Sequence, residues 1–428
     1  MSATLERGLS AFREYLDAPT ASFFSSCVHC GLCAESCLFY TETDDPKYTP
    51  IHRLEPLKRY WAQEHTFMGR IYALLGLIKP VTDRELAEWS ELVFDSCTLC
   101  GRCSMVCPVG NDLVYMIRRM REGVAAAGYA PKDLQAATRR NLEKGSAMGV
   151  SLQTLLAQVR HQEQETGISI PIDQEGCEVL LLLSSMEIVQ FPEFIGAVAR
   201  IFQQAGVTWT LSSEAFEATN GGIQIGVPDI ARQIVMRTVN VAERMGIKTV
   251  ICPECGHGFR ALRWEGEELI GRPYKFKVMH ILEILDQLRQ EGRLHLLEGE
   301  QDQRPLTYHD PCQIARRGGV VEQPRNLLKK VAADFREMED SGVMNWCCGG
   351  GGGVSTLEHA EKLRAQAFLR KKQQIEQLGV RTLVTACANC HMVIEGDLEN
   401  LGMDVEVISL TELVADHLDN SFQPSTTE

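Results

Sequence analysis

Long apolar runs and an excess of positive charge are both missing from this sequence. Its 428 residues carry a net charge of −14. Because nucleic-acid binding needs a basic face, this charge excludes nucleic acid as a partner. The most apolar stretch, residues 67–81, contains Arg70 and Lys79 and falls short of the roughly 20 apolar residues that a membrane-spanning helix needs. We therefore expect no transmembrane segment in this chain.

The apolar core of a secretion signal is also missing from residues 1–13. We therefore expect a cytoplasmic location, where thiols stay reduced, and the 16 cysteines suit metal ligation better than disulfides. The length predicts two or three domains. Hydrophobic residues make up 44% and charged residues 23%, which is ordinary for a soluble protein, so only the tail at residues 421–428 is expected to be disordered.

Eight cysteines near the start of the chain form two motifs with the same spacing. They are Cys27, Cys30, Cys33 and Cys37, followed by Cys97, Cys100, Cys103 and Cys107. In bacterial two-cluster ferredoxins with this spacing, three close cysteines bind one cubane and the fourth binds the other. We therefore assign one [4Fe-4S] cluster to Cys27, Cys30, Cys33 and Cys107, and a second to Cys97, Cys100, Cys103 and Cys37.

The surroundings of the two motifs fit the same interpretation. Pro108 follows the second motif as in ferredoxins, although Leu38 follows the first. Structural zinc is the alternative, but zinc sites usually take four ligands in pairs. Helices are expected at residues 54–63, 83–94 and 113–123. Residues 1–150 are therefore predicted to form a helical ferredoxin-like domain, followed by a linker at 151–176.

Five further cysteines form a different pattern in the last third of the chain. They are Cys312, the adjacent Cys347 and Cys348, and then Cys387 and Cys390. Five thiolates are one too many for a cubane, whereas an opened cluster with irons of unequal coordination could use all of them. The pattern resembles the cysteine-rich CCG motif of the heterodisulfide reductase family, in which such a set holds a noncubane [4Fe-4S] cluster. We therefore predict all five as metal ligands.

A run of glycines, residues 349–353, follows the adjacent cysteines. It could be mistaken for a phosphate loop, but it lacks the lysine and the Ser or Thr of such a loop. Glycines beside cluster cysteines are explained by close approach of the backbone and by amide groups that donate to sulfur. Gly349 and Gly350 are therefore predicted to lie against the cofactor.

The back half of the chain repeats itself. Residues 246–250 before Cys252 and Cys255 are similar to residues 379–383 before Cys387 and Cys390. Short apolar strands at 179–183, 249–252 and 306–308 alternate with helices at 230–245 and 357–378, which predicts an α/β fold of parallel sheets flanked by helices. We expect a degenerate CCG unit at 177–300 and a complete CCG unit at 301–420.

The first of these units has lost most of the predicted ligands. Ser185 stands opposite Cys312, and Thr219 with Asn220 stands opposite the adjacent cysteines. Two remaining thiolates cannot satisfy the cluster, so we predict a single noncubane cluster in the chain. Cys252 and Cys255 are either vestigial or form a reversible dithiol near the site.

From Cys27 to Leu413, the chain resembles the D-type subunit of heterodisulfide reductase. It is also similar to the iron–sulfur subunits of the sulfate-reducer membrane complexes of the Tmc, Hmc and DsrK type. The resemblance implies a hetero-oligomeric complex of anaerobic respiration with an integral-membrane cytochrome b-type subunit and other redox subunits. It also implies a peripheral place on the inner face of the cytoplasmic membrane and, as a further partner, a small sulfur-carrier protein.

Three functions are compatible with this layout. The first is an oxidoreductase subunit that moves electrons between a membrane cytochrome b or quinone pool and the noncubane site, for disulfide or trisulfide chemistry. The second is a pure electron relay without a substrate. The third is the iron–sulfur subunit of a flavin-dependent oxidase of 2-hydroxyacids such as glycolate or lactate, which would need a separate flavoprotein because this chain has no flavin-binding fingerprint.

Three polar residues lie next to or near the predicted ligands and are candidates for catalysis. His309, Asp310 and His391 could supply protons or hydrogen bonds, since imidazole titrates near neutral pH. Structural roles around the metal ligands are the alternative for all three.

Overall fold

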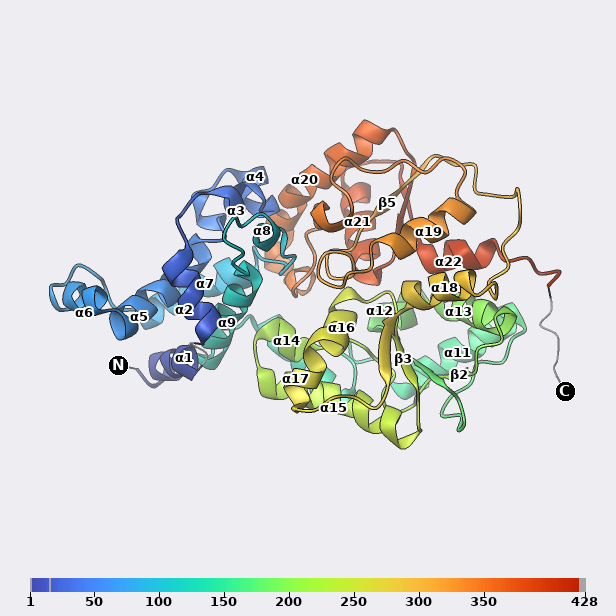
Figure 1. Cartoon of the computed structure of the whole chain (residues 1–428), viewed down its shortest axis with the longest axis horizontal. Coiled ribbons are helices and arrows are strands. Elements are labelled where there is room, and N and C mark those ends of the chain that lie inside the picture. The colour runs from blue at the N-terminus through green and yellow to red at the C-terminus, as the bar shows by residue number, and fades with distance from the viewer. Residues whose placement is uncertain (1, 15–16, 423–428) are drawn as a thin grey trace. The chain divides into compact units, whose positions relative to one another are not determined.

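A computed structural model describes residues 2–14 and 17–422, which form two compact units (Figure 1). Unit 1 comprises Met1–Ala136, Gly222–Val227 and Gly349–Arg370, and unit 2 comprises Ala137–Gly221, Pro228–Cys348 and Lys371–Glu428. The predicted tail at 421–428 lies outside the described residues from residue 423 onward.

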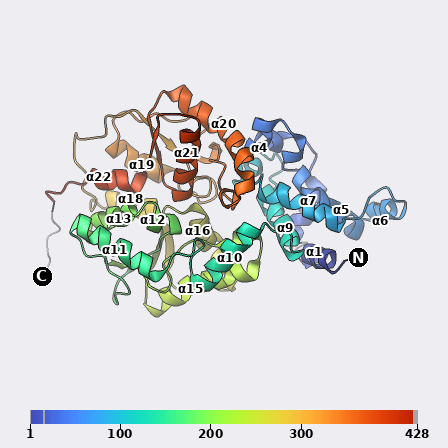
Figure 2. The same ribbon diagram turned by 180° about the vertical axis from the view of Figure 1, so that it is seen from behind.

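Unit 1 is built from helices, as predicted. Its longer helices are α1 (Ala3–Glu14), α2 (Ala18–Ser26), α5 (Glu55–His65), α6 (Phe67–Leu74), α7 (Asp83–Phe94) and α9 (Leu113–Ala126), and the short helices α3 (Leu32–Glu35), α4 (Leu38–Thr43) and α8 (Arg102–Met105) lie in or beside the cysteine motifs. The predicted helices at 54–63, 83–94 and 113–123 are therefore confirmed as α5, α7 and α9. Figure 2 shows α5, α7 and α9 from behind.

Side-chain caps explain where several of these helices begin. The Thr82 hydroxyl accepts a hydrogen bond from the Glu85 amide at 3.2 Å and starts α7. The Asp112 carboxylate accepts from the Val114 amide at 3.0 Å and starts α9. Buried side chains of these helices, including Leu86, Phe94 and Met120, form one apolar core with the second cysteine motif. The core therefore holds the cysteine motifs in place.

The first sheet of unit 2 has four parallel strands in the order β2-β1-β3-β4. They are β1 (Val179–Leu181), β2 (Trp209–Thr210), β3 (Thr249–Cys252) and β4 (Lys277–His280). The connecting helices are α12 (Ser185–Val189), α13 (Glu193–Gln204), α14 (Gly221–Ile225), α15 (Pro228–Arg244), α16 (Gly256–Arg260), α17 (Gly266–Ile270) and α18 (Ile281–Gln290), of which α14 lies largely in unit 1. Strands β1 and β3 are almost wholly buried, which is typical of a parallel sheet covered on both faces.

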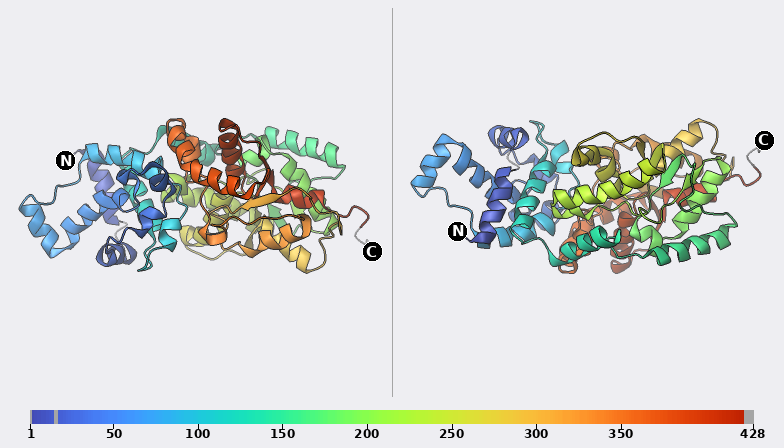
Figure 3. Two further views of the ribbon diagram at one scale, coloured as in Figure 1. Left: turned by 90° about the horizontal axis from the view of Figure 1, so that it is seen from above. Right: turned by 90° about the horizontal axis from the view of Figure 1, so that it is seen from below.

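The second sheet repeats the first with three parallel strands in the order β5-β6-β7. They are β5 (Leu306–His309), β6 (Thr382–Thr385) and β7 (Glu406–Ser409), accompanied by α19 (Glu322–Val331), α21 (Ala388–Asn400) and α22 (Leu410–Asp416), as Figures 1 and 3 show. An isolated parallel bridge between Leu306 and Phe335 stands where β2 stands beside β1. The fold class of a helical ferredoxin-like part and parallel sheets flanked by helices is therefore confirmed, and the shared strand order supports the predicted duplication.

Two segments differ from the expected elements. Helix α11 (Leu152–Thr166) occupies most of the segment expected as a linker at 151–176. Leu155 and Val159 lie one turn apart and are buried, so an otherwise polar sequence still has a face that can pack. The helix expected at 357–378 begins four residues later as α20 (Glu361–Leu378), after two short 3₁₀ turns. Helix α20, like α10 (Lys132–Lys144), contains a boundary between the units.

Candidate metal centres

The first cysteine set surrounds a cavity in unit 1. Cys27, Cys30, Cys33 and Cys107 line this cavity, whose volume is about 200 Å³, together with apolar side chains such as Phe23, Ile51 and Leu113. Cys30 is exposed, and the other three are partly buried. The fourth cysteine of the second motif therefore joins the first three of the first motif, which is the grouping predicted from the ferredoxin spacing.

The second set surrounds a smaller and more enclosed cavity in the same unit. Cys37, Cys97, Cys100 and Cys103 line it with Arg53, Ser96 and Ile117, and its volume is about 20 Å³. Cys37 and Cys97 are buried, and Cys100 and Cys103 are partly buried. The structure thus brings together both predicted sets of four, and their role as ligands stays a prediction.

The two motifs have the same unusual backbone. His29 and Leu99, each just before the second cysteine of its motif, have φ of +54° and +56°, and the glycines after that cysteine, Gly31 and Gly101, have φ of +86° and +81°. A non-glycine residue in this region costs on the order of 1 kcal/mol or more, so such strain marks a functional constraint. In the second motif the Leu99 amide donates a hydrogen bond to Cys97. The shared strain supports one function for both motifs.

The protonation of these thiols tests whether the sites fit a metal cluster. Burial, and then the neighbouring Cys27, Cys30 and Cys107, raises the pKa of Cys33 to about 11. Burial also raises the pKa of Cys97 above its usual value. Sulfurs packed this closely need a cation to become thiolates together, and iron supplies that charge. Four converging sulfurs in each set therefore fit an iron–sulfur cluster.

The five cysteines of the last third meet in unit 2, beyond the carboxyl ends of β5 and β6. All five are at most 8% exposed. The sulfurs of Cys312 and Cys347 are 3.8 Å apart, and those of Cys348 and Cys390 are 3.4 Å apart. None of the 16 cysteines of the chain forms a disulfide in the structure. Carboxyl ends of parallel strands are the usual place for ligands in such folds, and five buried thiols there fit a metal cluster.

Cys387 has the surroundings of a thiolate. It precedes α21 as the N-cap residue and receives hydrogen bonds from the Cys390 thiol and from the backbone amides of Cys390, Gly256 and Asn389. These bonds lower the pKa of Cys387 in spite of its burial. A helix N-terminus favours a negative charge, so the fold itself prepares this sulfur for a metal.

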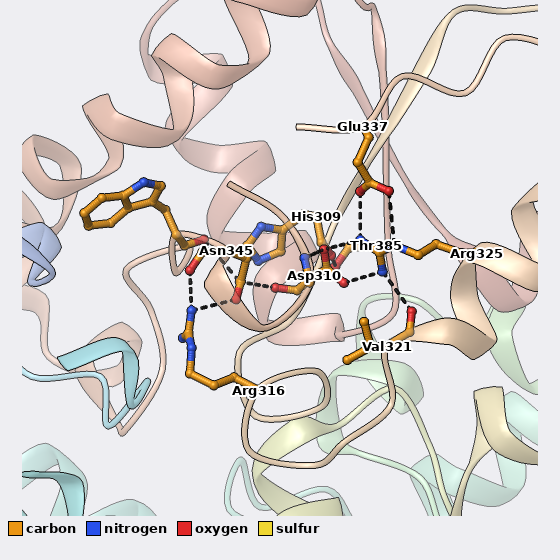
Figure 4. A network of polar contacts seen from close by, with 10 residues as sticks. His309, Asp310, Arg316, Val321, Arg325, Glu337, Asn345 and Thr385 are labelled. Carbon is orange, nitrogen blue, oxygen red and sulfur yellow. Dashed lines mark hydrogen bonds and ion pairs between the residues drawn. The ribbon is translucent and has the colours of Figure 1, made fainter. Parts of the chain in front are cut away.

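Asp310 lies at the centre of the polar network in Figure 4. Arg325 donates to both of its carboxylate oxygens at 2.8 Å, and the Gly342 amide donates to one of them at 2.7 Å. The Asn345 side chain donates to the backbone carbonyl of Asp310. The network therefore ties the chain just before Cys312 to the chain just before Cys347. This geometry fits a positioning role for Asp310.

His309 faces the cysteines. Its ring nitrogen and the sulfurs of Cys348 and Cys390 lie within 4.8 Å of one another. Its side chain is fully buried, and neither ring nitrogen has a hydrogen-bond partner among the described residues. Burial, and then Lys371, lowers the pKa of His309, so the ring is neutral near pH 7. A neutral imidazole in this position can donate one N–H to sulfur.

His391 has different surroundings. Its ring stacks on Phe191 with 4.1 Å between the ring centroids. Burial lowers the pKa of His391 to about 4, so this side chain is also neutral near pH 7. Its stacking explains its burial without a chemical role.

Lys371 is a residue near the site that the sequence reasoning missed. Its ammonium donates to the Gln374 side chain at 2.7 Å, and the side chain is 1% exposed. Burial lowers the pKa of Lys371 to about 8, while Asp310 and the site cysteines raise it. The signal was available, because Lys371 shares the buried face of α20 with Phe368 and Ile375.

The degenerate half of unit 2 has filled its lost ligand positions with hydrogen bonds. The Ser185 hydroxyl donates to Glu217 at 2.7 Å, and the Asn220 side chain donates to the Ala231 carbonyl at 3.0 Å. Burial strongly raises the pKa of both Cys252 and Cys255. Neutral buried thiols react slowly, which favours the vestigial interpretation over a reversible dithiol.

No helix within residues 2–14 and 17–422 has both the length and the apolar character that a membrane span requires. Helix α9, one of the longer helices of unit 1, has 14 residues.

Two family models match this chain. A 4Fe-4S dicluster domain matches residues 24–111, and a cysteine-rich domain of the CCG type matches residues 306–395. These ranges contain the first two cysteine sets and the five cysteines of the third site. They therefore support iron–sulfur clusters in both parts of the chain.

Among curated relatives, the iron–sulfur subunit of an Hdr-like menaquinol oxidoreductase from Archaeoglobus profundus is 25% identical over 89% of this chain and 77% of the relative. Iron–sulfur subunit 2 of the Archaeoglobus fulgidus enzyme of that name is 26% identical over 98% and 82%. The D-type subunit of the dihydromethanophenazine:CoB–CoM heterodisulfide reductase from Methanosarcina barkeri is 24% identical over 92% and 93%. The chain is thus an iron–sulfur protein of the heterodisulfide reductase D-like family, with a 4Fe-4S dicluster domain and a CCG domain.

Proposed function

We propose that this chain is the cytoplasmic iron–sulfur subunit of a membrane-bound respiratory complex. It moves electrons between a membrane cytochrome b or quinone pool and a noncubane [4Fe-4S] site at which disulfides or trisulfides react. Two cubane [4Fe-4S] clusters in unit 1 carry the electrons. The likeness to subunits named for menaquinol and heterodisulfide oxidoreduction supports this function.

One observation carries the proposal above the others. Five buried cysteines meet beyond β5 and β6, with sulfur separations of 3.4 and 3.8 Å, in a unit joined by the chain to two four-cysteine sets. A pure one-electron relay needs only cubanes, each of which uses four thiolates. A fifth thiolate is expected where one iron differs from the rest. The site is therefore better suited to sulfur chemistry than to storage alone.

The bound cluster would supply electrons one at a time and an iron to which a substrate sulfur can bind. The protein holds that centre through Cys312, Cys347, Cys348, Cys387 and Cys390. Asp310 and Arg325 keep the ligand segments in register, since their ion pair is buried and doubly hydrogen-bonded. His309 offers a neutral N–H toward Cys348 and Cys390, and Lys371 is a buried ammonium facing the same sulfurs. Both can stabilise negative charge that develops on sulfur.

A surface segment of unit 1 supports attachment to a membrane partner. Between Phe67 and Leu77, six large apolar side chains are 41% to 88% exposed; they are Phe67, Met68, Tyr72, Leu74, Leu75 and Leu77. An exposed apolar patch of this kind marks an interaction site. Arg70 and Lys79 are the charged residues nearest to it, so the patch is locally positive in a chain with a net charge of −14. We name residues 67–77 the apolar hairpin.

Two measurements test this function. The complex should copurify from membranes with a haem b subunit, and the chemically reduced chain should reduce a small disulfide or a persulfidated protein. Copurification with a flavoprotein in place of haem b would instead favour a 2-hydroxyacid oxidase subunit. A reduced chain that passes electrons to a redox dye but never to a disulfide would favour a relay.

A further inference from the structure

Arg53 is a fully buried arginine beside the second cysteine set. Its side chain is 1% exposed, and it lines the same cavity as Cys37, Cys97, Cys100 and Cys103. One guanidinium nitrogen lies 3.5 Å from the Cys37 sulfur. The other nitrogens donate to the backbone carbonyls of Leu92 at 3.1 Å and of Ser96 at 2.7 Å.

No carboxylate is among the hydrogen-bond partners of Arg53 in the described structure. Those partners are two carbonyl oxygens, the Ser96 hydroxyl and the Cys37 sulfur. Burial lowers the pKa of Arg53, but Cys37, Cys97 and Cys103 outweigh it and raise that pKa above its usual value. A buried charge is costly unless an opposite charge compensates it. The negative charge that compensates Arg53 therefore belongs to the cysteine set.

The first cysteine set has no such cation. None of the described residues that line its cavity is an arginine or a lysine. Lys58 approaches the edge of that set through His29, 3.0 Å from its ring, but this contact is exposed to solvent. Solvent screens an exposed charge, whereas a buried charge acts at nearly full strength. The two sets, so alike in spacing and backbone, thus differ in electrostatic environment.

We propose that the fixed charge of Arg53 raises the reduction potential of the cluster held by Cys37, Cys97, Cys100 and Cys103, so that electrons entering at the first set pass on to the second. This inference rests on the proposed function, because it assumes a cubane in each set. Transfer moves one electron from the first cluster, which is oxidised, to the second, which is reduced. No bond forms or breaks and no proton is taken up. A positive charge next to the accepting cluster stabilises the added electron, and a hydrogen bond to its ligand sulfur acts in the same direction.

A purely structural role is the competing explanation. Arg53 connects the turn before α5 to the carbonyls at the end of α7, and this contact alone could explain its burial. A structural role predicts changes in stability and iron content. It predicts no change in potential when the iron content is intact.

The test is a redox titration of the anaerobically reconstituted full-length chain, followed by EPR. Cys100→Ser and Cys30→Ser identify the signals of the second and first sets, because each alters one ligand. Arg53→Met and Arg53→Gln remove the charge, Arg53→Lys retains it, and Arg70→Met removes an exposed charge as a control. We expect both neutral variants to lower the midpoint of the second cluster by about 59 mV or more, a tenfold change for one electron. The first cluster, Arg53→Lys and Arg70→Met should keep their midpoints.

Three results would overturn the inference. One is an unchanged midpoint in a neutral variant that retains its iron. Another is an equal drop in Arg53→Lys. The third is loss of the second cluster from both neutral variants, since Arg53 would then hold the cluster and not set its potential. By contrast, an iron content near 8 in the unmodified chain would contradict the proposed function but leave this test intact, because both cubanes would still be present.

Discussion

Arg325 clasps Asp310 with two hydrogen bonds of 2.8 Å, and this ion pair lies two residues before Cys312. Asp310 is 1% exposed and also receives the Gly342 amide. Two ligand segments that are distant in the sequence thereby depend on a single carboxylate.

Removing this carboxylate should release both segments. Replacing Asp310 by Ala leaves the Arg325 charge buried with Glu337 alone, and breaking a buried pair from one side costs roughly 3–5 kcal/mol. We expect Asp310→Ala to lower the melting temperature and to lose the iron of the third site while the two cubanes remain. Asp334→Ala is the matched control, because its pair with Arg336 is about 40% exposed on both sides and should contribute at most about 1 kcal/mol. Equal iron contents in the two variants would contradict the positioning role.

Gly352 should tolerate no side chain. Its φ is +64°, and a Cβ there would lie 2.9 Å from the Thr98 carbonyl carbon and 3.0 Å from the Cys97 carbonyl oxygen. Overpacking against backbone typically costs about 1–3 kcal/mol, in addition to about 1 kcal/mol for the conformation. We expect Gly352→Ala to reduce the stability of unit 1 by about 2 kcal/mol or more. Gly128→Ala separates the two effects, because φ is +85° there and the space is open. If both variants melt together, the close contact has no energetic weight.

Much of the fold could be predicted because local patterns decide it. Helix α7 matches its prediction since Thr82 caps an amphipathic segment, and β3 matches since a short apolar run follows a glycine turn. The cysteine groupings could be predicted because spacing and backbone geometry are linked within a motif. The helix in the expected linker was missed, because Leu155 and Val159 are too few to stand out in a polar segment.

The charged part of the sites could not be predicted in the same way. Arg53 takes its partners from Leu92 and Ser96, which are about 40 residues away in the sequence. Lys371 faces cysteines that come from other strands. Such burial depends on tertiary contacts, and a sequence without contacts treats a lone arginine or lysine as exposed.

Stability should depend on pH through Glu412. Burial, and then Glu254, Glu193 and Asp416, raises the pKa of Glu412 from 4.5 to about 8. A raised folded-state pKa favours the protonated form, so this stabilisation is present below pH 4.5 and is lost as the pH rises through 8. We expect Glu412→Gln to be more stable than the unmodified chain at pH 8, by on the order of 2 kcal/mol, and to melt similarly at pH 4.5. Melting temperatures at pH 4.5, 6.5 and 8 measure this. Glu300→Gln, at an exposed position, should leave the pH profile unchanged. A parallel profile for Glu412→Gln would show that this carboxyl is already ionised in the fold.

The apolar hairpin should be needed for membrane recovery. Leu74 and Leu77 are 88% and 69% exposed, so a charge at either position has little effect on folding. We expect Leu74→Glu together with Leu77→Glu to shift the chain from the membrane fraction to the supernatant without loss of iron. Leu401→Glu, at a 40% exposed position of unit 2, should stay with the membranes. Retention of the double variant on membranes would show that the partner binds elsewhere.

Iron and acid-labile sulfide per chain test the central claim most directly, in the unmodified protein and in Cys347→Ser with Cys348→Ser. Three clusters of four irons predict about 12 iron atoms for the unmodified chain and about 8 for the variant, with the two cubane EPR signals retained. A value near 8 in the unmodified chain, unchanged in the variant, would contradict a cluster at the five-cysteine site.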